Sequence, residues 1–143
     1  MERIILVDAS GSMAEKGKGS AVKYLLYAVC SLLENECNIT EYSVYIWNSN
    51  IGKYSGKIKF EGKADEDRLK DFLGQHEDSR LLVISDGCFS ENTGMLLGNA
   101  GAMLLKVSSD QSIGRMGAVF GKRNVFDAAD AAECTVRFAN SGR

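Results

Sequence analysis

Three oxygen-bearing side chains stand at alternate positions near the start of the chain: Asp8, Ser10 and Ser12. They follow Ile4–Val7, an apolar and mostly β-branched run that is too short for a typical helix and is typical of a strand buried on both faces. Gly11 allows the chain to turn sharply between the two serines. Because the stretch offers a carboxylate and hydroxyls but no His or Cys, it predicts a site for a hard cation such as Mg²⁺ or Mn²⁺.

A second stretch repeats this arrangement later in the chain. Leu81–Ser85 reads as another buried strand, and Asp86 and Gly87 follow it directly. In an open α/β sheet, ligands bind beyond the carboxyl ends of the strands, at the point where the strand order reverses. Asp8 and Asp86 are therefore expected on the same edge of the sheet. The competing interpretation is that serines and aspartates after strands only form turns and cap helices.

Together the two stretches resemble the metal-ion-dependent adhesion site of von Willebrand factor type A domains. Asp8-x-Ser10-x-Ser12 resembles its first segment, and the strand that ends in Asp86-Gly87 resembles its second. The resemblance implies a doubly wound, Rossmann-like α/β fold in which the two strands are neighbours. It also implies that Asp8, Ser10, Ser12 and Asp86 hold the cation, directly or through water, and that a protein partner binds there.

The third segment of the family site departs from this pattern. The family has a threonine on the loop before the second helix, and here that loop, Phe60–Asp65, carries Ala64 at the matching place. A methyl group cannot bind a cation. We therefore expect weak cation binding that depends on Asp86 or recruits Asp65 through a water in place of the missing ligand.

The rest of the chain alternates between predicted strands and helices, which indicates a mostly parallel sheet covered by helices on both faces. Alternating lysines in the run from Lys53 to Phe60 indicate one antiparallel edge strand. The remaining strands are predicted at Tyr42–Trp47, Ala102–Val107 and Ala118–Phe120. The first helix is predicted from an N-cap at Ser20 to Asn35, and the second begins after an N-cap at Asp65. Later helices are predicted from Ser90 to Asn99 and at Asn124–Phe138, with a short helical turn at Gln111–Arg115 between them.

Size and composition favour one domain over residues 1–143. A net charge of −2 gives no reason to expect nucleic acid or an anionic membrane as a partner, and no apolar run reaches membrane-spanning length. The four cysteines lack metal-knuckle spacing, and Cys30 and Cys37 are too far apart along one helix for a disulfide. We therefore expect all four thiols to be reduced, which favours the cytoplasm. The N-terminus passes directly into a strand with no signal peptide, and this also predicts a cytoplasmic protein.

Other side chains receive supporting roles. Met13 and Phe89 directly follow the two cation segments and, with Asn48, are predicted to form a rim that contacts the partner. The only histidine, His76, is predicted to cap or pack a helix rather than to act in Ser-His-Asp chemistry. Four lysines are predicted to be solvated surface with no role in binding phosphate: Lys16, Lys18, Lys23 and Lys53.

The sequence thus predicts a non-catalytic protein-interaction module that binds an Asp or Glu of its partner through the cation. One alternative is a Mg²⁺-dependent phosphotransferase of the haloacid dehalogenase type, which also has an aspartate after its first strand. That family requires a second aspartate two residues later, where this chain has Ser10. The other alternative is a scaffold of the same fold whose metal site is degenerate.

Overall fold

The computed structural model describes residues 1–107 and 120–140. Within them one sheet has the strand order β3-β2-β1-β4-β5-β6. All neighbouring strands are parallel except β2 and β3, which are antiparallel. The strands are β1 (Glu2–Asp8), β2 (Ser43–Trp47), β3 (Ile51–Lys53), β4 (Ser79–Ser85), β5 (Met103–Lys106) and β6 (Val125–Asp127). The predicted fold class, mostly parallel with one antiparallel edge strand, is confirmed.

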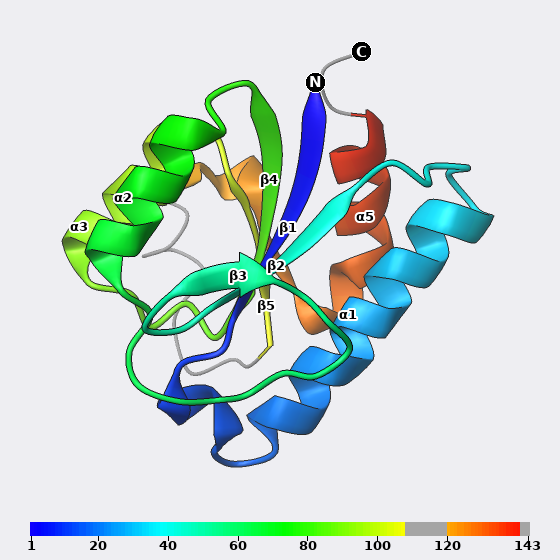
Figure 1. Cartoon of the computed structure of the whole chain (residues 1–143). Coiled ribbons are helices and arrows are strands. Elements are labelled where there is room, and N and C mark those ends of the chain that lie inside the picture. Colours follow the sequence, from blue (N-terminus) through cyan, green and yellow to red (C-terminus); the bar gives the residue numbers. More distant parts are fainter. Residues whose placement is uncertain (108–119, 141–143) are drawn as a thin grey trace.

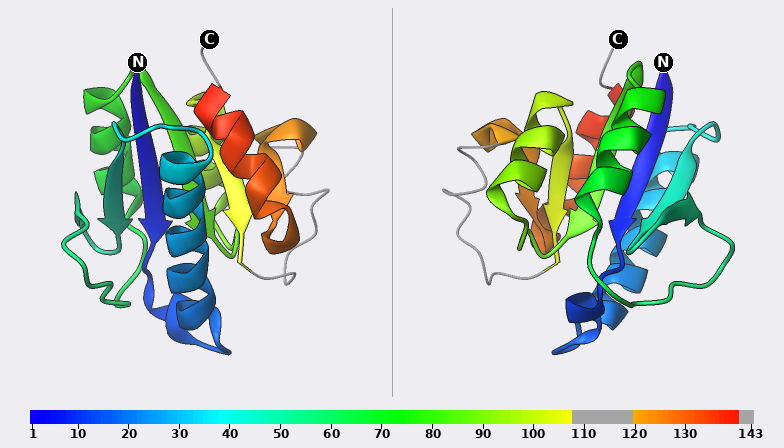
Figure 2. Two further views of the ribbon diagram at one scale, coloured as in Figure 1. Left: turned by 90° about the vertical axis from the view of Figure 1, so that its right-hand side faces the viewer. Right: turned by 60° about the vertical axis from the view of Figure 1, so that its left-hand side comes forward.

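Helices cover both faces of this sheet (Figures 1 and 2). α1 (Lys18–Asn35) and α5 (Ala131–Asn140) lie side by side on one face, and α2 (Glu66–Gln75) and α3 (Glu91–Asn99) lie on the other. Asp65 and Ser90 cap α2 and α3 as predicted, since their side chains accept hydrogen bonds from the backbone amides of the first turn. No helix in the described residues is long and apolar enough to cross a membrane.

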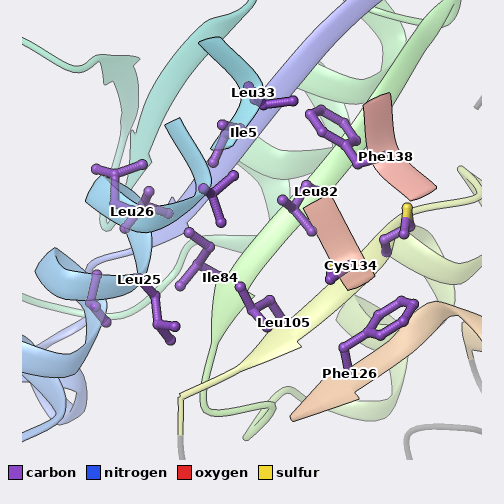
Figure 3. Packing of buried hydrophobic residues seen from close by; sticks show 14 of the residues in the cluster. Ile5, Leu25, Leu26, Leu33, Leu82, Ile84, Leu105, Phe126, Cys134 and Phe138 are labelled. Atoms are coloured by element: carbon purple, nitrogen blue, oxygen red, sulfur yellow. The ribbon is translucent and has the colours of Figure 1, made fainter. Parts of the chain in front are cut away.

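The continuous apolar runs of β1 and β4 are explained by this double covering. Successive side chains of a strand point to opposite faces, so Ile5 and Val7 pack toward α1 and α5 while Ile4 and Leu6 pack toward α2 and α3. Figure 3 shows the first of these two cores, where Leu82 and other strand residues meet side chains from both helices. Full burial of each such side chain contributes about 1.5–3 kcal/mol.

Two predicted element boundaries in the first half of the chain are wrong. α1 begins at Lys18 with Gly17 at its N-cap, so Ser20 lies inside the first turn. The antiparallel edge strand is β3 rather than the run from Lys53 to Phe60, because the chain reverses just after β2 and pairs Ile51 with Trp47. The residues between β3 and α2 form an irregular segment instead.

The predicted closing helix at Asn124–Phe138 is also wrong in its first part. The chain there forms a 3-10 turn (Lys122–Asn124), β6, a second 3-10 turn (Ala128–Asp130) and only then α5. The run of alanines suggested one long helix, but Val125 and Phe126 are β-formers that pair with β5 and are buried. The predicted turn at Gln111–Arg115 lies outside the described residues, as does the strand Ala118–Phe120 except for its last residue.

Candidate functional site

The sheet topology brings the two aspartates together. β1 pairs with β4, and the register that aligns Val7 with Ile84 places Asp8 beside Ser85 at the carboxyl edge of the sheet. The chain moves outward from β1 in one direction and from β4 in the other, so this edge is the switch point. A depression of about 560 Å³ opens there. Its lining includes Asp8, Ser10, Ser12 and Asp86, the predicted ligands, together with residues from the loop before α2 and from the start of α3.

Asp8 is held by a dense set of hydrogen bonds although only 3% of it is exposed. Its Oδ1 accepts from the Ser10 amide at 3.0 Å and from the Ser10 Oγ at 2.8 Å. Its Oδ2 accepts from the Ser85 Oγ at 2.6 Å. The Ser12 Oγ lies 3.4 Å from the Ser10 Oγ. The carboxylate and the two predicted hydroxyl ligands are therefore contiguous.

The electrostatic environment of Asp8 disfavours its negative charge. Burial raises the pKa of this carboxyl group, and the nearby charge of Asp86 adds to the increase. The hydrogen bonds from Ser85 and Ser10 act in the opposite direction, since they stabilise the ionised form. A positive charge in the depression would offset the remaining cost of holding two carboxylates so close together.

Asp86 already has a positive charge beside it. Its Oδ2 lies 3.0 Å from the Lys18 Nζ, in an ion pair whose side chains are 3% and 11% exposed. Its Oδ1 accepts from the Cys88 amide at 2.9 Å. The prediction that Lys18 is solvated surface is therefore wrong, whereas Lys16, Lys23 and Lys53 are exposed as predicted.

The loop before α2 lies along the turn that follows β1. The Gly11 amide donates to the Gly62 carbonyl at 2.9 Å, and the Glu61 amide donates to the Ala9 carbonyl at 3.0 Å. Ala64 lines the depression but brings only a methyl group. Further oxygens stand at the start of α2 and α3, where the hydroxyls of Ser90 and Thr93 lie 3.2 Å and 3.1 Å from the Glu66 Oε1.

The chemistry of these groups fits a hard cation. Carboxylate and hydroxyl oxygens are the donors that Mg²⁺ and Mn²⁺ prefer. In the part of the chain that the structure describes, no group of three or more His, Cys, Asp or Glu side chains could hold a metal. A cation at this edge would therefore depend on the two serine hydroxyls as well as on Asp8 and Asp86.

The predicted rim is only partly present. Met13 is fully buried in the core on the α1 face, so its assignment to an exposed rim is wrong. Phe89 is half-buried, lines the depression and stacks on Trp47 with ring centroids 5.8 Å apart. The Asn48 side chain holds its own loop, because it donates to the Lys59 carbonyl and accepts from the Asn50 amide.

His76 lies away from this edge, at the C-terminal end of α2. Its Nδ1 is 2.9 Å from the Glu2 Oε1 at the start of β1, and its ring packs against Phe72 and Tyr45. The predicted capping and packing role is confirmed.

Sequence reasoning missed two side chains of the site. Ser85 could have been found from strand periodicity, because the register of neighbouring parallel strands puts it on the same face as Asp8. Lys18 carries no such signal. It is one of two lysines in the glycine-containing stretch Ala14–Gly19, and only the folded backbone shows which of them turns inward.

Comparison with known proteins supports the fold. No family model matches the sequence, and no curated protein matches it. Among solved structures, the chain resembles a protein described as "von Willebrand factor type A from Catenulispora acidiphila", with a TM-score of 0.63 and 14% identity over 97% of this chain. The chain spans 42% of the length of that protein. The architecture of this chain is therefore a von Willebrand factor type A fold.

Proposed function

We propose that this chain is a non-catalytic interaction module that binds another protein through Mg²⁺ or Mn²⁺ held by Asp8, Ser10, Ser12 and Asp86. One observation carries the proposal. The Asp8 carboxylate and the two serine hydroxyls form a contiguous set of oxygens in a depression that Asp86 also lines. The von Willebrand factor type A fold supports the proposal, because it places this depression at the switch point of the sheet.

The composition of the ligand set explains how a partner would be recognised. Mg²⁺ takes about six oxygen ligands, so four protein side chains leave room for water and for one group from outside. The serine hydroxyls carry no charge, so a cation that Asp86 contacts only through water stays under-neutralised, which favours an Asp or Glu side chain as the incoming group. The half-buried ring of Phe89 would give this partner an apolar contact beside the cation.

Two features support binding rather than catalysis. Ser10 occupies the position at which a phosphotransferase of the haloacid dehalogenase type requires a second aspartate. The only histidine of the chain pairs with Glu2 away from the depression. We therefore expect no turnover of a generic aryl phosphate in the presence of Mg²⁺. Turnover that is lost on Asp8→Asn would instead support the phosphotransferase alternative.

The cation itself is tested by thermal unfolding in chelator and in excess Mg²⁺ at matched ionic strength. At about ten times the dissociation constant, linkage adds about 1.4 kcal/mol to the free energy of unfolding, which for a domain of this size raises the melting temperature by about 3–6 °C. Asp8→Asn should lose this increase. The matched control Asp71→Asn, which removes an exposed carboxylate on α2, should keep it. Equal Mg²⁺ shifts in wild type and Asp8→Asn would favour the degenerate scaffold.

A further inference from the structure

The ammonium group of Lys18 donates a hydrogen bond to the Asp86 Oδ2, an oxygen of the candidate cation site. We propose that Lys18 is a tethered counter-ion that competes with the divalent cation for Asp86, so that cation binding and release of the Lys18 side chain are one coupled event. This inference rests on the proposed function. It adds a regulatory residue to the four ligands and explains why the site would bind its cation weakly.

Both oxygens of the Asp86 carboxylate already have hydrogen-bond partners. Oδ1 accepts from the Cys88 amide at 2.9 Å and lies 3.5 Å from the Ser85 Oγ. Oδ2 is the oxygen that Lys18 holds at 3.0 Å. A cation bound at Oδ2 would therefore meet the ammonium group there, and the two positive charges would compete for the same oxygen.

The backbone before α1 positions Lys18 for this contact. Lys16 and Gly17 both have positive φ angles, 51° and 76°, and this pair of left-handed residues turns the chain so that α1 starts beside the sheet edge. A cation is disfavoured at a helix N-terminus, because the helix dipole is positive there. Lys18 is the first residue of α1, so the ion pair with Asp86 offsets an unfavourable interaction with the helix dipole.

The charges of the site give the direction of the effect. Asp8, Asp86 and Lys18 sum to −1 in the ionised state, and without Lys18 the two carboxylates would present −2 to the cation. Even at the dielectric constant of water, a unit charge about 5 Å from a divalent ion changes its binding by at least about tenfold. Removing the ammonium charge should therefore tighten cation binding, and adding the cation should expel the ammonium group.

The experiment is isothermal titration of Mn²⁺ into the wild type, Lys18→Met, Lys18→Arg and the matched control Lys23→Met. Lys23 is an exposed lysine on the same helix, so its replacement removes the same charge from outside the site. Lys18→Met should bind Mn²⁺ at least about tenfold more tightly than the wild type. Lys18→Arg and Lys23→Met should stay within about twofold of the wild type. Equal affinities for the wild type and Lys18→Met would overturn the inference.

A measurement on the wild-type protein covers the case in which Lys18→Met fails to fold. An amine-reactive reagent should label Lys18 slowly in chelator, because its side chain is 11% exposed, and faster in saturating Mn²⁺. The labelling rate of Lys23 should not change. Unchanged labelling of Lys18 in saturating Mn²⁺ overturns the inference but leaves the proposed function standing. Absence of Mn²⁺ binding in the wild type and in every variant overturns both.

Discussion

Opposing effects act on the ionisation of the Asp8 carboxyl group, and the Ser85 hydroxyl provides one of them. Burial raises the pKa of Asp8, while the 2.6 Å hydrogen bond from the Ser85 Oγ lowers it. The same hydroxyl accepts from the Gly87 amide at 3.1 Å and so ties the turn after β4 to the end of β1. At the scale of single residues, Ser85 thus links the two segments of the site.

Ser85→Ala should therefore destabilise the protein. Both hydrogen bonds of this fully buried hydroxyl would be lost and the Asp8 Oδ2 would lose a donor, at a cost of about 1–3 kcal/mol in the free energy of unfolding. Urea unfolding in chelator measures this cost. The exposed Ser55→Ala serves as the control and should be near neutral. A loss below about 0.5 kcal/mol for Ser85→Ala would show that neither hydrogen bond contributes to stability.

The raised pKa of Asp8 predicts a definite pH dependence in chelator. The folded protein retains the Asp8 proton at pH values at which the unfolded chain has lost it, so stability falls as the pH rises through the folded-state pKa. Asp8→Asn removes this titration. The free energy of unfolding of Asp8→Asn, compared with that of the wild type, should be highest at neutral pH. This advantage should decline as the pH is lowered toward about 4, the ordinary pKa of an aspartate. A difference that is constant with pH would contradict the raised pKa.

The sequence predicted the acidic half of the site but not its basic half. Asp8 and Asp86 were recognisable because each follows a buried apolar strand, and parallel strands end on one edge. Lys18 was not, because its inward direction depends on backbone angles at Lys16 and Gly17 that no side-chain pattern reports. Met13 was misplaced for a related reason, since the 3-10 turn Gly11–Ala14 directs it into the core.

At the scale of elements, the turn that starts α1 precedes Lys18, which pairs with Asp86. Gly17 has φ 76°, and a Cβ added there would meet no other atom within 4 Å. Gly17→Ala should therefore cost about 1 kcal/mol through backbone strain alone. Gly52→Ala is the matched control, because Gly52 has equally open surroundings and no positive φ angle. Equal stabilities of the two variants in urea unfolding would contradict the strained turn.

Element types were easier to predict than element boundaries. Buried strands such as β4 and capped helices such as α2 carry strong local signals. The short strands β3 and β6 do not. β3 is only three residues long, and β6 is paired with β5 by contacts distant in the sequence. The alanines after Asp127 favoured a single helix locally, and tertiary pairing of Val125 and Phe126 overrode that preference.

At the scale of the whole molecule, the two-sided burial of the sheet predicts a sharp difference among the thiols. Cys134 is fully buried between α5 and the sheet, and burial raises its pKa to about 12. Cys88 is exposed beside the depression. At pH 8 a thiol reagent followed by mass spectrometry should modify Cys88 in the native protein and reach Cys134 only after unfolding. Rapid native modification of Cys134 would contradict the packing of α5.

A divalent cation that binds where β1 and β4 end is located most directly by paramagnetic broadening of backbone amide signals with substoichiometric Mn²⁺. The broadening should be strongest at Ser10, Ser12, Gly87 and Cys88, whose segments converge on the depression. Amides near the opposite edge, such as those of His76 and Ser79, should be little affected. In Asp8→Asn the pattern should disappear. Broadening centred elsewhere, or equally strong in Asp8→Asn, would contradict the proposed site.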